Sequence, residues 1–287
     1  MRMIPVSAAL LLAAAPWASG SAVAQPVNPF TGVTRIWLEW NEIPNTQWAP
    51  RSIDPEARPD KSLSVVKFQP VVPFRLNDDW TLVTRTVFRY INKPDADPVF
   101  GFNPQTQAPG LLGFNQKNSA GLNSVNPSFF FAPNIGKNSA IGFGPSLAVS
   151  INEDVGHNQF GVGPAVMAFH RSGRWTYGIR ARQIWGVSNR TDNEDLNNLV
   201  AQPVLRYQLN RNWYLLSSPI VTADFNLEKA WTVPIGGGIG YNFGLTQKSQ
   251  AMVSLEGYYN AIKPEVLGEE LLGDWTIRAQ FQVVIPN

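Results

Sequence analysis

The chain has 287 residues, a formal net charge of +2 and no cysteine. The lack of cysteine excludes a secreted protein stabilised by disulfides. The small net charge, without a run of like charges, gives no reason to expect nucleic acid as a partner.

The first segment in chain order has the three regions of a secretory signal peptide. A positive charge near the start is followed by an apolar run over residues 4–15 and by the small-x-small sequence Ala-Val-Ala. As a helix this run is too short to cross about 30 Å of hydrocarbon, so an uncleaved anchor is the weaker alternative. We expect residues 1–24 to be a signal peptide cleaved between Ala24 and Gln25, and residues 25–287 to be one domain.

The rest of the chain shows almost no helical periodicity. Polar and apolar residues alternate with period two, in runs separated by clusters of Asn, Asp, Gly, Ser and Pro. This pattern predicts twelve strands, at residues 31–43, 63–76, 80–91, 121–133, 140–151, 159–171, 175–188, 199–209, 213–225, 231–245, 251–262 and 275–285.

Short and long connections alternate between these strands. The tight turns fall at residues 77–79, 172–174 and 210–212, and the long connections include residues 44–62, 92–120, 189–198 and 263–274. If strands run up and down, the tight turns share one rim and the long loops the other, as in outer-membrane barrels. Such barrels have an even number of strands, and the last strand closes on the first so that no edge stays exposed.

The two faces of each predicted strand differ in charge. A charged side chain on the lipid face costs about 2–4 kcal/mol near the membrane midplane, so the charged face is expected to point inward. A soluble β protein, with the apolar face inside, is the alternative. Tryptophans that open strands favour the membrane, because such rings gather at its interfaces. They are Trp80, Trp175, Trp213, Trp231 and Trp275.

The sequence thus predicts an all-β fold, an antiparallel up-and-down transmembrane β-barrel of twelve strands. Its strand at residues 231–245 contains PIGGGIGYNFG, in which Gly236, Gly237, Gly238 and Gly240 could suggest a phosphate loop. A phosphate loop needs a following helix and usually a Lys-Ser/Thr pair, and neither follows. Glycines that bend a barrel wall or make room for bulky neighbours are the better interpretation.

Several segments, taken in order, resemble a known family. They are Phe68-Gln69-Pro70 before Asn77–Trp80, Ala201-Gln202-Pro203 before Asn210–Trp213, WYLLSSPIVTADF (213–225), WTVPIGGGIGYNF (231–243), GYYN (257–260) and DWTIRAQFQVVIP (274–286). Together they resemble the outer-membrane proteins associated with the meta-pathway of phenol degradation, often labelled transporters. The resemblance covers most of the mature chain and is strongest from Leu199 onward. It implies an outer-membrane barrel that takes up aromatic or other hydrophobic compounds.

The last residue of the closing strand differs from that of many outer-membrane barrels, whose chains end in an aromatic residue. Here the last residues are Ile285-Pro286-Asn287. Phe281 and Ile285 would then have to serve in any signal that the barrel-insertion machinery recognises.

An outer-membrane enzyme would need a nucleophile, a base and an orienting group. His157, in an expected loop, and His170, at a strand end, are the two histidines, and neither lies in a zinc or esterase motif. Asp192, Glu194 and Asp195 could hold a cation on oxygen ligands, but a solvated loop explains them better. We expect no enzyme, no catalytic residue, no metal and no cofactor.

The charged residues on the inward face are the candidates for selectivity of a pore. They are Arg85, Arg89, Arg180, Arg182, Arg206, Arg278, Glu39 and Glu256. The arginine excess predicts a preference for anions, including aromatic carboxylates. The alternative is that these charges pair and fill the lumen. Twelve strands lie between the eight that side chains fill and the sixteen that leave an aqueous channel, so a narrow or partly plugged lumen is expected.

The long connection at residues 92–120 carries five large apolar side chains, Phe100, Phe102, Leu111, Leu112 and Phe114. It could fold inward as a constriction or an apolar access site for ligands. An exposed loop is an equal alternative.

These features predict a passive channel in the outer membrane of a Gram-negative bacterium. Its partners would be outer-membrane lipid, the barrel-insertion machinery during assembly and an unidentified small, hydrophobic or aromatic molecule. A closed-lumen structural or adhesive barrel that acts through its external loops is the second hypothesis. A soluble periplasmic lipid carrier is the third.

Overall fold

The structure is a computed structural model that describes residues 33–103, 107–136, 138–152, 155–156, 159–187, 196–246 and 249–286. The expected signal peptide and its cleavage site lie outside these residues. Within the described ranges, no helix is long and apolar enough to cross a membrane.

One antiparallel sheet accounts for almost all of the described secondary structure. Its strands are β1 (Val33–Thr46), β2 (Lys61–Arg75), β3 (Trp80–Asn103), β4 (Ala108–Pro133), β5 (Ser139–Ser150), β6 (Phe160–Ser172), β7 (Trp175–Gly186), β8 (Asn197–Gln208), β9 (Trp213–Ser217), β10 (Val221–Asp224), β11 (Trp231–Gly244), β12 (Gln250–Ile262) and β15 (Trp275–Pro286). The strands β13 (Glu265–Val266) and β14 (Glu269–Glu270) form a separate small hairpin.

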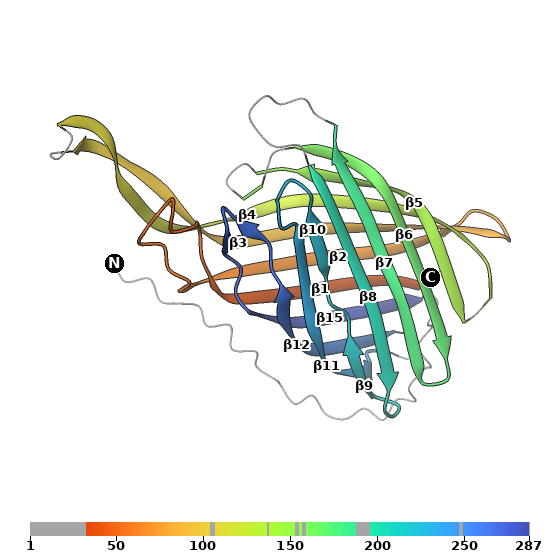
Figure 1. Ribbon diagram of the computed structural model, residues 1–287. Coiled ribbons are helices and arrows are strands. Elements are labelled where there is room, and N and C mark those ends of the chain that lie inside the picture. The colour runs from red at the N-terminus through yellow and green to blue at the C-terminus, as the bar shows by residue number, and fades with distance from the viewer. Residues whose placement is uncertain are drawn as a thin grey trace.

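The sheet closes on itself as a barrel (Figure 1). Strand β1 pairs with β15 over ten residues, from Val33 with Pro286 to Glu42 with Ile277. Segments β9 and β10 share the position between β8 and β11, so the thirteen segments of the sheet occupy twelve positions. The predicted twelve-stranded antiparallel barrel is confirmed, and among the described residues its closure leaves no open edge in the barrel wall.

The outer surface of the barrel is apolar and its interior is polar. Along β1, Leu38 and Trp40 are exposed, whereas Glu39 and Asn41 are buried. Exposed Leu255 on β12 alternates in the same way with buried Glu256. This is the reverse of a soluble β protein and suits a barrel surrounded by lipid.

Aromatic side chains gather at both ends of the barrel wall. Trp80, Trp175 and Trp213 open strands at the rim of the tight turns, and Trp231 and Trp275 open strands at the opposite rim. All five are exposed. Their ring centroids lie 4.6–6.5 Å from an aromatic neighbour, in the pairs Trp80–Phe143, Trp175–Tyr207, Trp213–Tyr241, Phe225–Trp231 and Tyr259–Trp275. Two such belts are the arrangement typical of membrane barrels.

Most of the segment predicted as a long loop, residues 92–120, is instead strand, over residues 92–103 and 108–120. Strands β3 and β4 pair from Trp80 with Pro133 to Asn103 with Ala108. Neighbouring strands reach only Asn92 on β3 and Ser124 on β4, so residues 93–103 and 108–120 form a two-stranded ribbon that projects beyond the rim (Figure 1). The loop prediction was wrong because its prolines and glycines were taken as breakers. An isolated ribbon has two edges, where a proline without an N–H group is tolerated.

Candidate binding site in the barrel lumen

The inward side chains form two adjoining regions. The first, here called the Arg278 network, consists of Glu39, Asn41, Lys67, Ser218, Glu256, Tyr258, Arg278 and Gln280. The second is a cavity that continues from the network toward the rim of the tight turns. Glu39, Ser218 and Gln280 belong to both.

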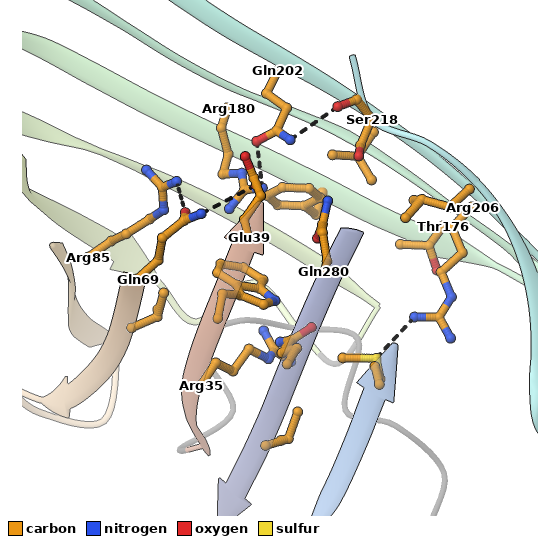
Figure 2. A pocket seen from close by; sticks show the side chains of 18 of the residues that line it. Arg35, Glu39, Gln69, Arg85, Thr176, Arg180, Gln202, Arg206, Ser218 and Gln280 are labelled. Atoms are coloured by element: carbon orange, nitrogen blue, oxygen red, sulfur yellow. Dashed lines mark hydrogen bonds between the residues drawn. The ribbon is translucent and has the colours of Figure 1, made fainter. Parts of the chain in front are cut away.

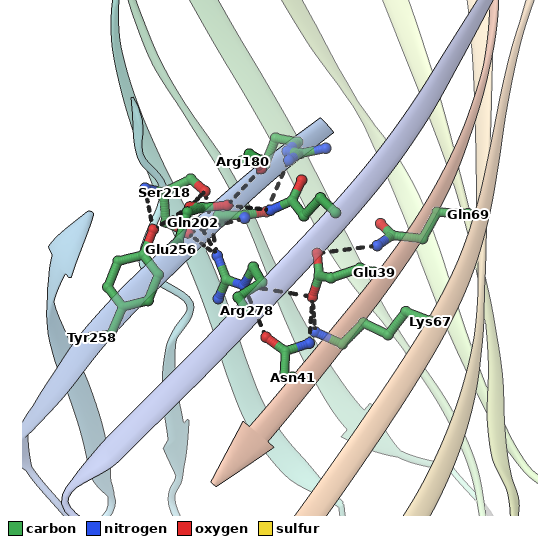
Figure 3. Close-up of polar contacts among 12 residues, drawn as sticks. Glu39, Asn41, Lys67, Gln69, Arg180, Gln202, Ser218, Glu256, Tyr258 and Arg278 are labelled. Atoms are coloured by element: carbon green, nitrogen blue, oxygen red, sulfur yellow. Dashed lines mark hydrogen bonds and ion pairs between the residues drawn. The ribbon is translucent and has the colours of Figure 1, made fainter. Parts of the chain in front are cut away.

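Arg278 is the centre of the network and is only 1% exposed. Its Nε donates a hydrogen bond to Asn41 Oδ1 at 2.8 Å, and its Nη1 donates to the Ser218 carbonyl at 2.7 Å (Figure 3). Its guanidinium nitrogens lie 3.9 Å from Glu39 Oε1 and 3.7 Å from Glu256 Oε2. One buried cation is therefore flanked by two carboxylates.

Both carboxylates have further donors. Lys67 Nζ lies 2.8 Å from Glu39 Oε1, and Asn41 Nδ2 donates to the same oxygen at 2.8 Å. Glu256 accepts hydrogen bonds from Ser218 Oγ at 2.8 Å, from Gln280 Nε2 at 2.9 Å and from the Tyr258 hydroxyl. Each charge in the network thus meets an opposite charge and several hydrogen-bond donors or acceptors, the condition under which buried ions are tolerated.

A glycine in β11 lets this network form across a strand. Gly238 pairs with Leu216 on one side and with Glu256 on the other, so no β11 side chain stands at this level between β9 and β12. A Cβ at Gly238 would lie 1.9 Å from the Leu255 carbonyl oxygen. Across β11, Ser218, at the break between β9 and β10, reaches Glu256 on β12.

The cavity has a volume of about 180 Å³. Residues from β1, β2, β3, β6, β7, β8, β9, β12 and β15 line it (Figure 2). The lining side chains include those of Arg35, Trp37, Glu39, Gln69, Val71, Arg85, Met167, Phe169, Arg180, Gln202, Arg206, Tyr214 and Met252. The lining thus combines cationic groups with aromatic and sulfur-containing ones.

Neutral groups hold the cavity arginines. Arg180 Nη2 donates to Gln202 Oε1 at 2.8 Å, and Arg85 Nη2 donates to Gln69 Oε1. Arg206 donates to two amide oxygens, those of Gln208 at 2.9 Å and Asn242 at 3.2 Å. Within the described part of the chain, none of these three arginines forms an ion pair with a carboxylate.

Two of the cavity arginines also stack on aromatic rings. The Arg180 guanidinium carbon lies 5.0 Å from the ring centroid of Trp37 and 6.0 Å from that of Phe169. The Arg206 guanidinium carbon lies 3.6 Å from the ring centroid of Tyr214. Cation–π contacts of this kind attract the charge without neutralising it.

The expected inward residues divide between the two regions. Arg85, Arg180 and Arg206 line the cavity, Arg278 and Glu256 belong to the network, and Glu39 belongs to both. Arg89 and Arg182 follow Arg85 and Arg180 on the same faces of β3 and β7, but neither lines the cavity. The aromatic lining residues Trp37, Phe169 and Tyr214 were not predicted. Period-two parity would have found Trp37, which stands on the charged face between Arg35 and Glu39.

The five apolar residues expected in a possible constriction do not lie in the lumen. Phe100 and Phe102 are 72% and 62% exposed on the projecting ribbon, and Leu111 and Leu112 are exposed there too. Phe114 packs against Trp48 of the β1–β2 connection, with ring centroids 4.9 Å apart. The segment is neither a constriction nor a loop, because strand pairing carries it away from the barrel.

The other candidates for chemistry contribute little. His157, Asp192, Glu194 and Asp195 lie outside the described residues. The Nδ1 atom of His170 lies 2.8 Å from Ser139 Oγ at the rim of the tight turns. In the described ranges, no group of three or more His, Cys, Asp or Glu side chains is placed to hold a metal ion.

Comparison with known proteins extends the assignment of the fold. No family model and no curated protein matches the sequence. An outer membrane channel from Pseudomonas putida F1 aligns with a TM-score of 0.56 and 14% identity, over 94% of this chain and 99% of that chain. The NanC porin aligns with a TM-score of 0.48 and 11% identity, over 88% of this chain and 98% of that chain. The Pseudomonas putida toluene transporter TodX aligns with a TM-score of 0.45 and 10% identity, over 91% of this chain and 92% of that chain. The first likeness shows that this chain has the fold of an outer-membrane channel barrel.

Proposed function

We propose that this protein is a passive channel of the Gram-negative outer membrane that admits small, hydrophobic or aromatic molecules. The observation that carries the proposal is a cavity with aromatic walls inside a closed barrel whose outer surface is apolar. A cavity of this kind can hold a solute part-way across the barrel. The fold shared with an outer membrane channel and the sequence resemblance to transporter-like barrels support it.

The route to the membrane belongs to the same proposal. Export would depend on cleavage of residues 1–24, and insertion would depend on the barrel-assembly machinery. The exposed apolar surface would then contact outer-membrane lipid, with the aromatic belts at its two interfaces.

Single-channel recording in a planar bilayer tests the proposal. We expect protein extracted from the outer membrane to give steady openings. The inward arginines should give an anion preference, seen in the reversal potential across a salt gradient. A barrel that inserts fully but stays silent would overturn the channel function.

A closed structural or adhesive barrel is the second candidate, and the β3–β4 ribbon favours it. Residues 93–120 present exposed Phe100 and Phe102 well beyond the rim, where a surface partner could reach them. A silent barrel whose attachment to surfaces is lost when the ribbon is shortened would support this function instead.

A further inference from the structure

The lumen cavity has an unbalanced charge. Its lining contains three arginines with neutral hydrogen-bond partners, Arg85, Arg180 and Arg206, and one carboxylate, Glu39. Glu39 is already engaged by Lys67 and Arg278. Like charges that converge in a small space of low dielectric repel one another strongly, so an anion would be attracted to this position.

The guanidinium groups are oriented before any ligand arrives. Gln202 presents its oxygen to Arg180 because its own amide nitrogen donates to the Ser218 carbonyl at 3.2 Å. Gln69 presents its oxygen to Arg85, while its nitrogen lies 3.4 Å from Glu39 Oε2. The Arg278 network thus anchors the amides that hold the cavity arginines. A ligand would not have to order these side chains, which favours its binding.

Donors remain for that ligand. Arg85 and Arg180 line the cavity and each donates one hydrogen bond, from Nη2, so the other N–H groups of the two guanidinium groups have no hydrogen-bond partner among the described residues. A buried charged donor without an acceptor is unfavourable, and a carboxylate is the acceptor that guanidinium groups bind best, often through two parallel hydrogen bonds.

Aromatic and apolar groups form the rest of the wall. Trp37 and Phe169 lie beside Arg180 and pack against a buried apolar cluster that includes Val71 and Met167. The volume of about 180 Å³ is close to the roughly 150 Å³ of a cavity that accommodates benzene. An inorganic anion would leave this wall uncovered, and an uncharged ring would leave the arginine donors unpaired.

From these observations we infer that the cavity is a binding site for a monoaromatic carboxylate. The carboxylate would accept hydrogen bonds from Arg180 and Arg85, and the ring would lie against Trp37 and Phe169. This site rests on the proposed function in one respect, since a bound solute reaches it through the lumen of the channel.

Calorimetric titration of the detergent-solubilised protein tests the site without requiring conductance. We expect benzoate to bind at least about tenfold more tightly than benzyl alcohol, acetate or inorganic phosphate, because each of these lacks the charge or the ring. If phosphate binds as tightly as benzoate, the cavity is a general anion-binding site without selectivity for an aromatic ring. Equal binding of benzyl alcohol would show that the arginines play no part. Either result overturns the inference.

Two arginines on one face of β7 provide a matched pair of variants. Arg180→Gln should weaken benzoate binding about ten- to hundredfold, the effect of losing a charged hydrogen bond. Arg182→Gln makes the same change of charge two residues away but outside the cavity. It should weaken benzoate binding much less than Arg180→Gln, because it removes a neighbouring charge but no hydrogen bond to the ligand. Equal losses in both variants would show a general effect of lumen charge and contradict a specific site. If Arg180→Gln does not fold, Arg85→Gln takes its place.

The failures of the two proposals are distinguishable. Conductance without selective benzoate binding would leave the channel and remove the site. Selective benzoate binding by a barrel that is silent in a bilayer would leave the site and remove the channel.

Discussion

The two regions of the lumen use arginine in opposite ways. Arg278 lies within 4 Å of two carboxylates and donates to an amide oxygen and a backbone carbonyl. Arg180 donates to one amide oxygen and stacks near two rings, and its Nε has no partner among the described residues. Both side chains point inward from long strands. The hydrogen-bond and ion-pair partners of an inward arginine, and not the direction of its side chain, therefore determine whether it is structural or available to a ligand.

Removing the central cation should have the largest effect. Arg278→Met leaves buried Glu256 without a positive partner, and breaking a buried ion pair in this way costs about 3–5 kcal/mol. We expect a much lower urea midpoint for the barrel in detergent micelles.

A double variant distinguishes the loss of stability caused by the uncompensated charge from the loss caused by altered packing. Adding Glu256→Gln to Arg278→Met removes the uncompensated carboxylate and should restore part of the lost stability. An unchanged midpoint in Arg278→Met would show that the network does not stabilise the barrel.

Gly240→Ala should disturb the cavity and leave the network intact. Its Cβ would lie 2.1 Å from Tyr214 Cζ, and the Tyr214 ring is held against Arg206, so overpacking should cost about 1–3 kcal/mol. Gly257→Ala is the control, because nothing lies within 4 Å of its Cβ position. Equal urea midpoints for the two variants would contradict the close contact.

Gln202→Glu should make the cavity resemble the network. The new carboxylate would take the place of the amide oxygen 2.8 Å from Arg180 Nη2 and would add an opposite charge to that hydrogen bond. We expect a weaker anion preference in the reversal potential, and some loss of stability because Gln202 Nε2 no longer donates to the Ser218 carbonyl.

Asn77→Asp adds the same charge outside the lumen. An aspartate there can still accept from the backbone N–H groups of Asp79 and Trp80, as Asn77 does. The reversal potential should then change much less than in Gln202→Glu. An equal change would show that the total charge of the protein, not the cavity, sets selectivity.

Much of the barrel could be predicted from alternation alone. A period of two defines both the strand and its faces, so Leu38 and Glu39 are separated correctly once the charged face is placed inside. The even number of predicted strands also predicts that β1 pairs with β15 in an antiparallel barrel, as the structure shows. The β3–β4 ribbon could not be predicted, because Pro94 and Pro98 argue against a central strand but not against an isolated two-stranded one.

The division of the lumen into two regions was beyond sequence reasoning. Arg180 and Arg278 look alike as inward arginines of alternating strands. Their difference depends on side chains far away in the chain, since Asn41 and Ser218 are 237 and 60 residues from Arg278. Such contacts follow from the curvature of the closed wall, which no local pattern specifies.

The seam between β1 and β15 joins the two ends of the sheet. Both backbone pairing and hydrogen bonds between buried polar side chains stabilise this seam. Arg278 of β15 bonds to Asn41 of β1 directly across it. A slip of one residue during closure would turn Asn41 toward lipid and leave Arg278 without its acceptor. A barrel closed in the wrong register would therefore lose this hydrogen bond and be less stable than the native one, so the arginine that stabilises the wall also favours its correct register.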